Sequence, residues 1–241
     1  QANYNDLVKQ LQTVSVSLRG HQYDLKDLTK RLQSIEESIK NNAKISDAEK
    51  QKIEKLLRDL VHAEDALSDA EEVVSNYEAE LMTAKGKVLE VTTDVQAAST
   101  EQSVAEQKKK LADAFKGLQD ADNADIKALT FDLFNKEYLD DSKAWNTIFA
   151  AATIESESDK ELFMSFAKEL YAKVIADNAG ADAWTLNQTV CKTVTANYIT
   201  DVVDEALTQA DAALAENKQV LQEAENKVAE LETKKADAEE A

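Results

Sequence analysis

The side chains best suited to catalysis or metal binding are few and scattered. The sequence has two histidines, His21 and His62, and a single cysteine, Cys191. Neither an H-x-x-x-H nor an H-E-x-x-H pair occurs, and one cysteine cannot supply a Cys-pair zinc site, so no metal centre is predicted. His21 is expected to hydrogen-bond across a helix seam, the alternative being a pH switch or ligand. Cys191 is expected to be a small buried apolar residue rather than a reactive thiol.

Motifs for other chemistries are missing from the sequence as well. Four isolated glycines form no phosphate-binding loop, no dinucleotide fingerprint and no nucleophile elbow. The 47 acidic residues are spread along the chain, so no pair of carboxylates is marked out by its spacing. We therefore expect a protein that is not an enzyme, with no catalytic residues and no cofactor. A net charge of −19 repels nucleic-acid phosphates, which excludes nucleic acid as an expected partner.

Two further motifs concern modification and charge. Asn187 opens Asn-Gln-Thr, the only N-x-[ST] sequon, and is a candidate N-glycosylation site if the chain is secreted. The run Lys108-Lys109-Lys110 suits either an acidic partner or the solvated end of a helix, where cations complement the helix dipole. We favour the helix end.

Composition indicates that helices position these residues. The chain has no proline, 31% charged and 43% hydrophobic residues, and Ala and Glu dominate it. Turn-rich sheets need proline and glycine, whereas Ala and Glu are strong helix formers. The fold class predicted is all-α.

The strongest pattern is a heptad repeat from Ile53 to Ala98. Small or apolar residues alternate there in steps of three and four, which keeps one helix seam against partner helices. Its members are Ile53, Leu56, Leu60, Ala63, Leu67, Ala70, Val74, Tyr77, Leu81, Ala84, Val88, Val91, Val95 and Ala98. This repeat predicts a helix over about 47–110.

Two more long helices carry similar seams. One is predicted over about 4–40, and Ser46 with Glu49 forms a capping box that separates it from the 47–110 helix. The other begins at about Asn187 and returns to the C-terminus. Its early apolar residues recur in steps of four and its later ones in heptads, so a stutter that locally unwinds the helix is expected between them.

Residues 115–184 differ from the rest because they hold all six Phe and both Trp. Short helices are predicted over about 123–139, 142–153 and 157–178, with Asp141 or Ser142 and Ser156 or Ser158 as caps. Large aromatic side chains give such a head its own core. The candidate ligand-facing residues of this head are Phe131, Phe134, Trp145 and Phe149.

These elements predict an elongated, antiparallel three-helix bundle with a small helical head. Residues 1–114 form a helix hairpin, residues 115–184 form the head between the second and third long helices, and residues 185–241 form the third helix. In this layout the head lies at one end of a rod. The returning helix brings the C-terminus toward the hairpin at the other end.

In composition and layout the whole chain resembles the surface coat proteins of African trypanosomes, among them the glutamic acid/alanine-rich proteins of the insect stages. The similar features are the hairpin at 41–46, the aromatic head and a third helix ending in Thr233-Lys-Lys-Ala-Asp-Ala-Glu-Glu-Ala241. The lone Cys191 departs from related trypanosome proteins that carry disulfides. The resemblance implies a GPI anchor at the C-terminus, the extracellular face of the plasma membrane, and neighbouring coat molecules as partners.

The predicted function is therefore a protective, non-catalytic coat glycoprotein packed densely on a parasite surface. One alternative is a surface receptor whose head binds a host or vector ligand, which requires exposed aromatic side chains. Another is a helical pore-forming toxin, because residues 144–154 are the most apolar stretch of the chain. An intracellular coiled-coil scaffold is the fourth hypothesis.

Overall fold

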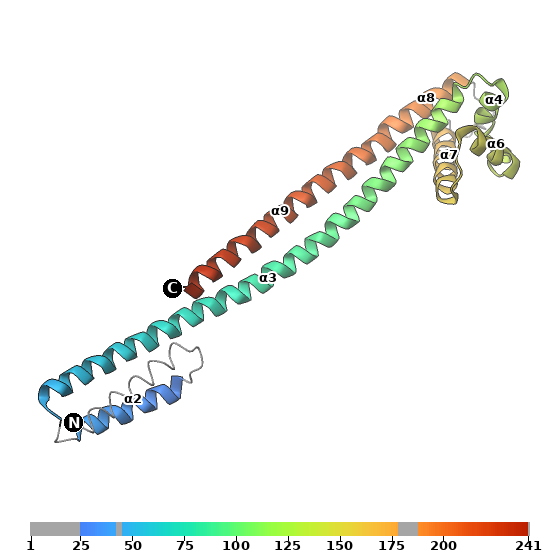
Figure 1. The fold of residues 1–241 in the computed structure, drawn as a ribbon. Coiled ribbons are helices and arrows are strands. Elements are labelled where there is room, and N and C mark those ends of the chain that lie inside the picture. The colour runs from blue at the N-terminus through green and yellow to red at the C-terminus, as the bar shows by residue number, and fades with distance from the viewer. Residues whose placement is uncertain (1–24, 42–44, 178–187, 241) are drawn as a thin grey trace. The chain divides into compact units, whose positions relative to one another are not determined.

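The computed structural model describes residues 25–41, 45–177 and 188–240, and their regular structure is helical (Figure 1). The elements, in chain order, are α2 (Leu25–Lys40), α3 (Asp47–Gln119), α4 (Ala124–Asp132), α5 (Lys136–Leu139), α6 (Ser142–Ala152), α7 (Glu157–Asp177), α8 (Gln188–Tyr198), the π-helix η2 (Ile199–Asp204) and α9 (Glu205–Glu240). The all-α prediction is confirmed for these residues.

The chain divides into two compact units. The first comprises Gln1–Ala84 and Lys227–Ala241, and the second comprises Lys85–Asn226. The long helices α3 and α9 each contribute to both. The second unit also holds α4 to α8, so it contains the whole aromatic head.

In the first unit, the capping box forms as predicted. The Ser46 backbone N–H donates to Glu49 Oε2 at 3.0 Å, and the Glu49 N–H donates back to Ser46 Oγ at 3.3 Å. Four isoleucines are buried near this capping box: Ile35 and Ile39 of α2, Ile45 just before α3, and Ile53 of α3. The predicted helix end at Lys40 is confirmed, whereas the start at about residue 4 lies outside the described residues.

The predicted seam needs a correction near the start of α3. Leu56 is 47% exposed and Ala63 is exposed, whereas Leu57 is buried to 8% and Glu64 is buried as well. The buried edge therefore departs from the predicted seam at Leu56 and Ala63, where the following residue is buried instead, while Ile53 is buried and Leu60 half-buried as predicted. From Leu67 to Ala98 every predicted seam residue is buried or half-buried.

In the second unit, α3 pairs with α9 in antiparallel orientation. Val91, Ala98 and Leu214 are buried between them. Gln102 Nε2 donates to Asp211 Oδ1 at 2.7 Å, and Lys109 Nζ lies 2.8 Å from Asp204 Oδ1. The first contact joins α3 to α9 and the second joins α3 to η2, and together they fix the register of α3 against the returning helix.

A π-helix occupies the place of the predicted stutter. Buried residues recur there in steps of four: Cys191, Thr195, Ile199 and Val203. Each such step exceeds an α-helical turn by about 0.4 residue, so a purely α-helical row would drift away from the core. The wider i→i+5 turn of η2 offsets that drift. Each of these buried residues lies one position later in the chain than the apolar residue that the sequence pattern predicted, and Val202 is exposed.

The head helices follow local capping signals. Asn123 Oδ1 accepts the backbone N–H of Asp125 and Ile126, Asp141 Oδ1 accepts that of Lys143, and Ser156 Oγ accepts that of Asp159. The single helix expected over 123–139 is instead split into α4 and α5. The helix expected to end at about Lys110 continues to Gln119, so α3 has 73 residues.

Candidate functional site

The head core is built from the end of α3, the helices α4 to α7 and the start of the returning helix. All six Phe are buried in it, and Phe115 of α3 lies at its centre. The ring of Phe115 has its centroid 5.6 Å from that of Phe166, 5.8 Å from Phe163 and 6.4 Å from Phe134, mostly edge to face. This arrangement matches the geometry that aromatic pairs prefer.

The four residues predicted to face a ligand belong to this core, so that prediction is corrected. Phe131, Phe134, Trp145 and Phe149 are only 2–8% exposed. Trp145 stacks on Phe149 and donates its Nε1–H to the Leu139 carbonyl at 2.8 Å. Their apolar area stabilises the head, because short helices cannot bury enough surface separately.

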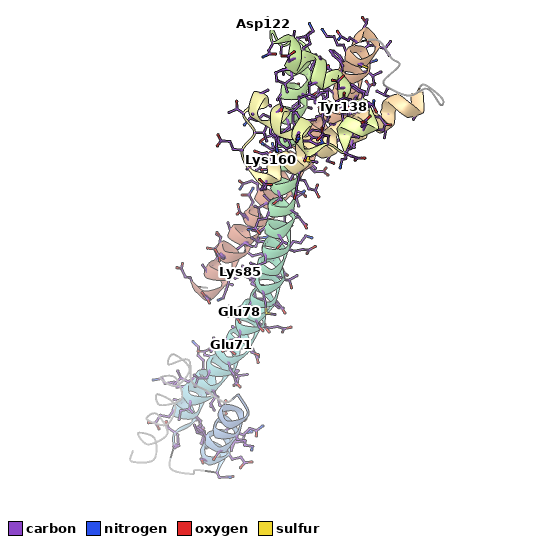
Figure 2. All side chains as sticks on the ribbon, turned by 90° about the vertical axis from the view of Figure 1, so that its right-hand side faces the viewer. Glu71, Glu78, Lys85, Asp122, Tyr138 and Lys160 are labelled. Atoms are coloured by element: carbon purple, nitrogen blue, oxygen red, sulfur yellow. The ribbon has the colours of Figure 1, made fainter. Side chains whose placement is uncertain are left out.

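The apolar stretch 144–154 largely coincides with α6, and one side of that helix contributes to the same core. Ala144, Trp145, Ile148 and Phe149 are buried, while the residues between them are exposed. Lys160, labelled in Figure 2, lies on α7 with its Nζ 5.9 Å from the centroid of the Phe149 ring. The stretch is therefore accounted for as an amphipathic head helix.

A polar cluster around Glu169 joins three elements of the second unit. Lys108 Nζ of α3 donates to Glu169 Oε2 at 2.8 Å, and the Tyr198 hydroxyl of α8 donates to the same oxygen at 2.5 Å. Ser165 Oγ donates to Oε1 at 3.4 Å. Two helix partners thus hold one carboxylate of α7.

The pKa shifts of Glu169 and Tyr198 indicate a structural hydrogen bond rather than a catalytic pair. Burial by itself would raise the pKa of Glu169, but the donors Lys108 and Tyr198 outweigh it and leave the pKa below its usual range. Burial, together with the bond to Glu169, raises the pKa of Tyr198. Glu169 therefore stays ionised and Tyr198 stays protonated at neutral pH, so neither is poised to exchange a proton.

A second polar contact is fully buried beside the cysteine. Gln119 Nε2 donates to Thr195 Oγ1 at 2.9 Å, and that hydroxyl donates to the Cys191 carbonyl at 2.8 Å. Cys191 is buried, and burial raises the pKa of its thiol. The prediction of a small buried residue is confirmed, since a reactive cysteine needs a lowered pKa and access.

The three lysines at 108–110 do not end a helix, because α3 continues past them. Lys108 pairs with Glu169, Lys109 pairs with Asp113 and Asp204, and Lys110 is exposed. The lysine run therefore mainly joins α3 to α7 and to η2. The expectation of a solvated helix end is corrected accordingly.

Two grooves lie along the helix pairs. In the first unit a groove of about 710 Å³ between α2 and α3 is lined by His62 with Glu54, Glu64 and Asp65. In the second unit a groove of about 560 Å³ between α3 and α9 is lined by four alanines together with Val104, Thr100, Gln209, Glu101 and Lys108. His21 and Asn187 lie outside the described residues.

Groups of three or more His, Cys, Asp or Glu side chains that could hold a metal ion do not occur among the described residues. Within the same residues, no helix has the length and apolar character needed to cross a membrane.

Comparisons with known proteins give no relative. No family model matches the chain, and neither a curated protein nor a solved structure is similar to it.

The Glu169 cluster and the Gln119–Thr195 contact were not predicted from the sequence. Their partners are 29 to 76 residues apart along the chain, and no motif links them. A weak signal was present in Gln119, a polar residue that follows the apolar Leu111, Phe115 and Leu118 on α3.

Proposed function

We propose that this chain is a non-catalytic coat glycoprotein of the cell surface, of the kind found in African trypanosomes. The observation that carries the proposal is the closed aromatic core of the head. All six Phe and Trp145 are buried there, and many exposed residues of α3 and α9 are acidic, with single exposed apolar side chains such as Met82 and Leu89 between them. A head that turns its large apolar side chains inward suits a surface that must resist adhesion.

The proposal includes the finer architecture and the attachment. The long helices form an elongated three-helix bundle, a C-terminal GPI anchor holds the chain on the extracellular face of the plasma membrane, and neighbouring copies surround it. Asn187 carries an N-linked glycan. The resemblance to coat proteins supports these points, and the negative charge of −19 keeps crowded neighbours soluble.

The decisive test combines the sequence of the full gene with the location of the protein on living cells. The precursor should encode an N-terminal signal peptide and, beyond Ala241, a hydrophobic tail of roughly 10–20 residues that a GPI transamidase removes. Antibody should stain unpermeabilised cells, and phosphatidylinositol-specific phospholipase C should release the antigen while leaving a transmembrane control protein in place. A reading frame that stops at Ala241, or staining only after permeabilisation, would refute the proposal.

The same observations separate the proposal from a toxin or an aromatic receptor. A pore former has to release α6 from the head, and that breaks the stacking of Trp145 on Phe149. Incubation with liposomes of neutral and anionic lipid should therefore produce no dye leakage between pH 5 and 7. Leakage that Trp145→Ala abolishes would instead favour the pore-forming function.

A further inference from the structure

Gly86 lies in the interior of α3, where no packing contact requires a glycine. A Cβ added at this position would meet no other part of the structure within 4 Å. Compared with alanine, a glycine in a helix interior shifts the local equilibrium toward the unfolded form by about fivefold. Gly86 therefore weakens α3 locally without improving its packing.

Three threonines close to Gly86 form hydrogen bonds that compete with those of the helical backbone. Oγ1 of Thr83, Thr92 and Thr93 donates to the carbonyl of the residue four positions earlier, at 3.1, 2.7 and 3.2 Å respectively. Such a bond shares a carbonyl that the helix itself uses, and it slightly destabilises and bends helices. Residues 83–93 are therefore the weak segment of α3.

The weak segment also begins in a part of α3 that has little buried surface. Between Glu64 and Val91, where the structure describes every residue of the helix, the seam residues are half-buried and none is fully buried. From Val91 onward buried residues return, at Ala98 and then at Leu111 and Ala112. Because a segment with few buried contacts needs little free energy to open, α3 should open most readily just before Val91.

Two lysines flank Gly86 at exposed positions. Lys85, labelled in Figure 2, precedes Gly86 on α3, and Lys87 follows it. Lys87 Nζ lies 3.0 Å from Glu90 Oε1, but both side chains are more than half exposed, and such a surface pair contributes little to stability. The weak segment therefore presents a basic residue on each side of its glycine.

We propose that residues 83–93 open locally in the folded protein and form a processing site for a protease that selects a basic residue before the cleaved bond. A peptide bond inside a helix is cleaved only from an opened form of the chain, so both local opening and a basic residue are required. The bonds after Lys85 and Lys87 meet both requirements. Hydrolysis of the Lys85–Gly86 bond consumes one water and leaves a carboxylate on Lys85 and an amino group on Gly86.

The test is limited digestion of the full chain with trypsin, with the fragments identified by mass spectrometry. Each cleavage rate is divided by the rate for the same bond in a short synthetic peptide, which corrects for the preferences of the enzyme. Cleavage after Lys85 or Lys87 should then be at least about tenfold faster than cleavage after Lys110, which is also exposed on α3 but is followed by the buried Leu111 and Ala112. Amide hydrogen exchange should likewise be faster in residues 83–93 than in residues 98–112.

Matched glycine variants show whether the opening is local. Gly86→Ala should slow the corrected cleavage after Lys85 and Lys87 by about fivefold, because alanine favours the closed helix. Gly117→Ala makes the same change elsewhere in α3, where a Cβ also meets nothing within 4 Å, and should alter these rates by less than about twofold. Circular dichroism of both variants should match that of the parent chain.

Three results would overturn the proposal. The first is equally fast cleavage after Lys110, and the second is hydrogen exchange that is no faster in residues 83–93 than in residues 98–112. The third is equal slowing by Gly86→Ala and Gly117→Ala, which would show that cleavage follows unfolding of the whole chain. None of these results bears on the GPI anchor, so the proposed coat function stands or falls separately.

Discussion

Replacing Phe115 with Ala should remove the centre of the head core. The side chain is 1% exposed and touches the rings of Phe134, Phe163 and Phe166. Truncating a buried Phe to Ala costs about 3–5 kcal/mol in free energy of unfolding, and lost aromatic pairs add to that loss. We expect about 4 kcal/mol for Phe115→Ala, and about 1 kcal/mol for Phe115→Leu, which keeps most of the volume.

The assay is urea unfolding followed by the fluorescence of Trp145. A Trp184→Phe background leaves Trp145 as the sole tryptophan, and its stacking on Phe149 reports the head. Leu89→Ala is the control, because Leu89 lies on the same helix in the same unit but is 72% exposed. It should change the free energy of unfolding by less than about 0.5 kcal/mol.

The reasoning fails if Phe115→Ala and Leu89→Ala destabilise the head equally. It also fails if Phe115→Ala lowers the free energy of unfolding by less than about 1 kcal/mol, since removing a buried ring with three aromatic neighbours should cost more than that. Either result would mean that the head core is looser than the structure describes.

Four smaller perturbations test single contacts. Bonds from Lys108 and Tyr198 hold the pKa of Glu169 below its usual range, so the stability that they confer is present above the ordinary pKa of a carboxyl group and is lost as the pH falls through the lowered pKa. Glu169→Gln should therefore lower the free energy of unfolding by about 1 kcal/mol at pH 7. The same variant should flatten the acid side of a plot of urea midpoint against pH. Ser46→Ala should cost about 1 kcal/mol by removing the N-cap of α3, measured by thermal unfolding at 222 nm, and Ser46→Asp should restore most of it. Thr153 ends α6 in the left-handed region at φ 58°, so Thr153→Gly should raise the urea midpoint by an amount equivalent to about 1 kcal/mol, and a lower midpoint would contradict the strain. Burial raises the pKa of the Cys191 thiol, so it should react with Ellman's reagent far more slowly in native protein than in urea; equal rates would contradict its burial.

Features set by neighbours in sequence were predictable. The capping box at Ser46 and Glu49, the caps at Asp141 and Ser156 and the bounds of α7 follow from residues within one helical turn. The stutter was also readable, because a change from steps of four to heptads is a local pattern. Its form as a π-helix was not.

Features set by distant partners were not predictable. Whether Leu56 or Leu57 is buried depends on which edge of α3 meets its neighbours, and the heptad alone does not decide it. Phe131 and Trp145 were assigned to a ligand because aromatic side chains suit both cores and binding surfaces. The hydrogen bond from Tyr198 to Glu169 joins two residues that are 29 positions apart in the sequence, and only the fold brings them together.

The π-helix at Ile199–Asp204 has a consequence for how this chain tolerates changes in length. A π-turn holds one residue more than the α-helical path it replaces, so deleting one residue from it leaves an unbroken α-helix. Because the π-turn absorbs one residue, that deletion would leave Leu207 and the rest of α9 in the same phase relative to Cys191. The head and the long helix pair are thus joined at a point that can lose one residue without breaking the helix or turning its buried side away.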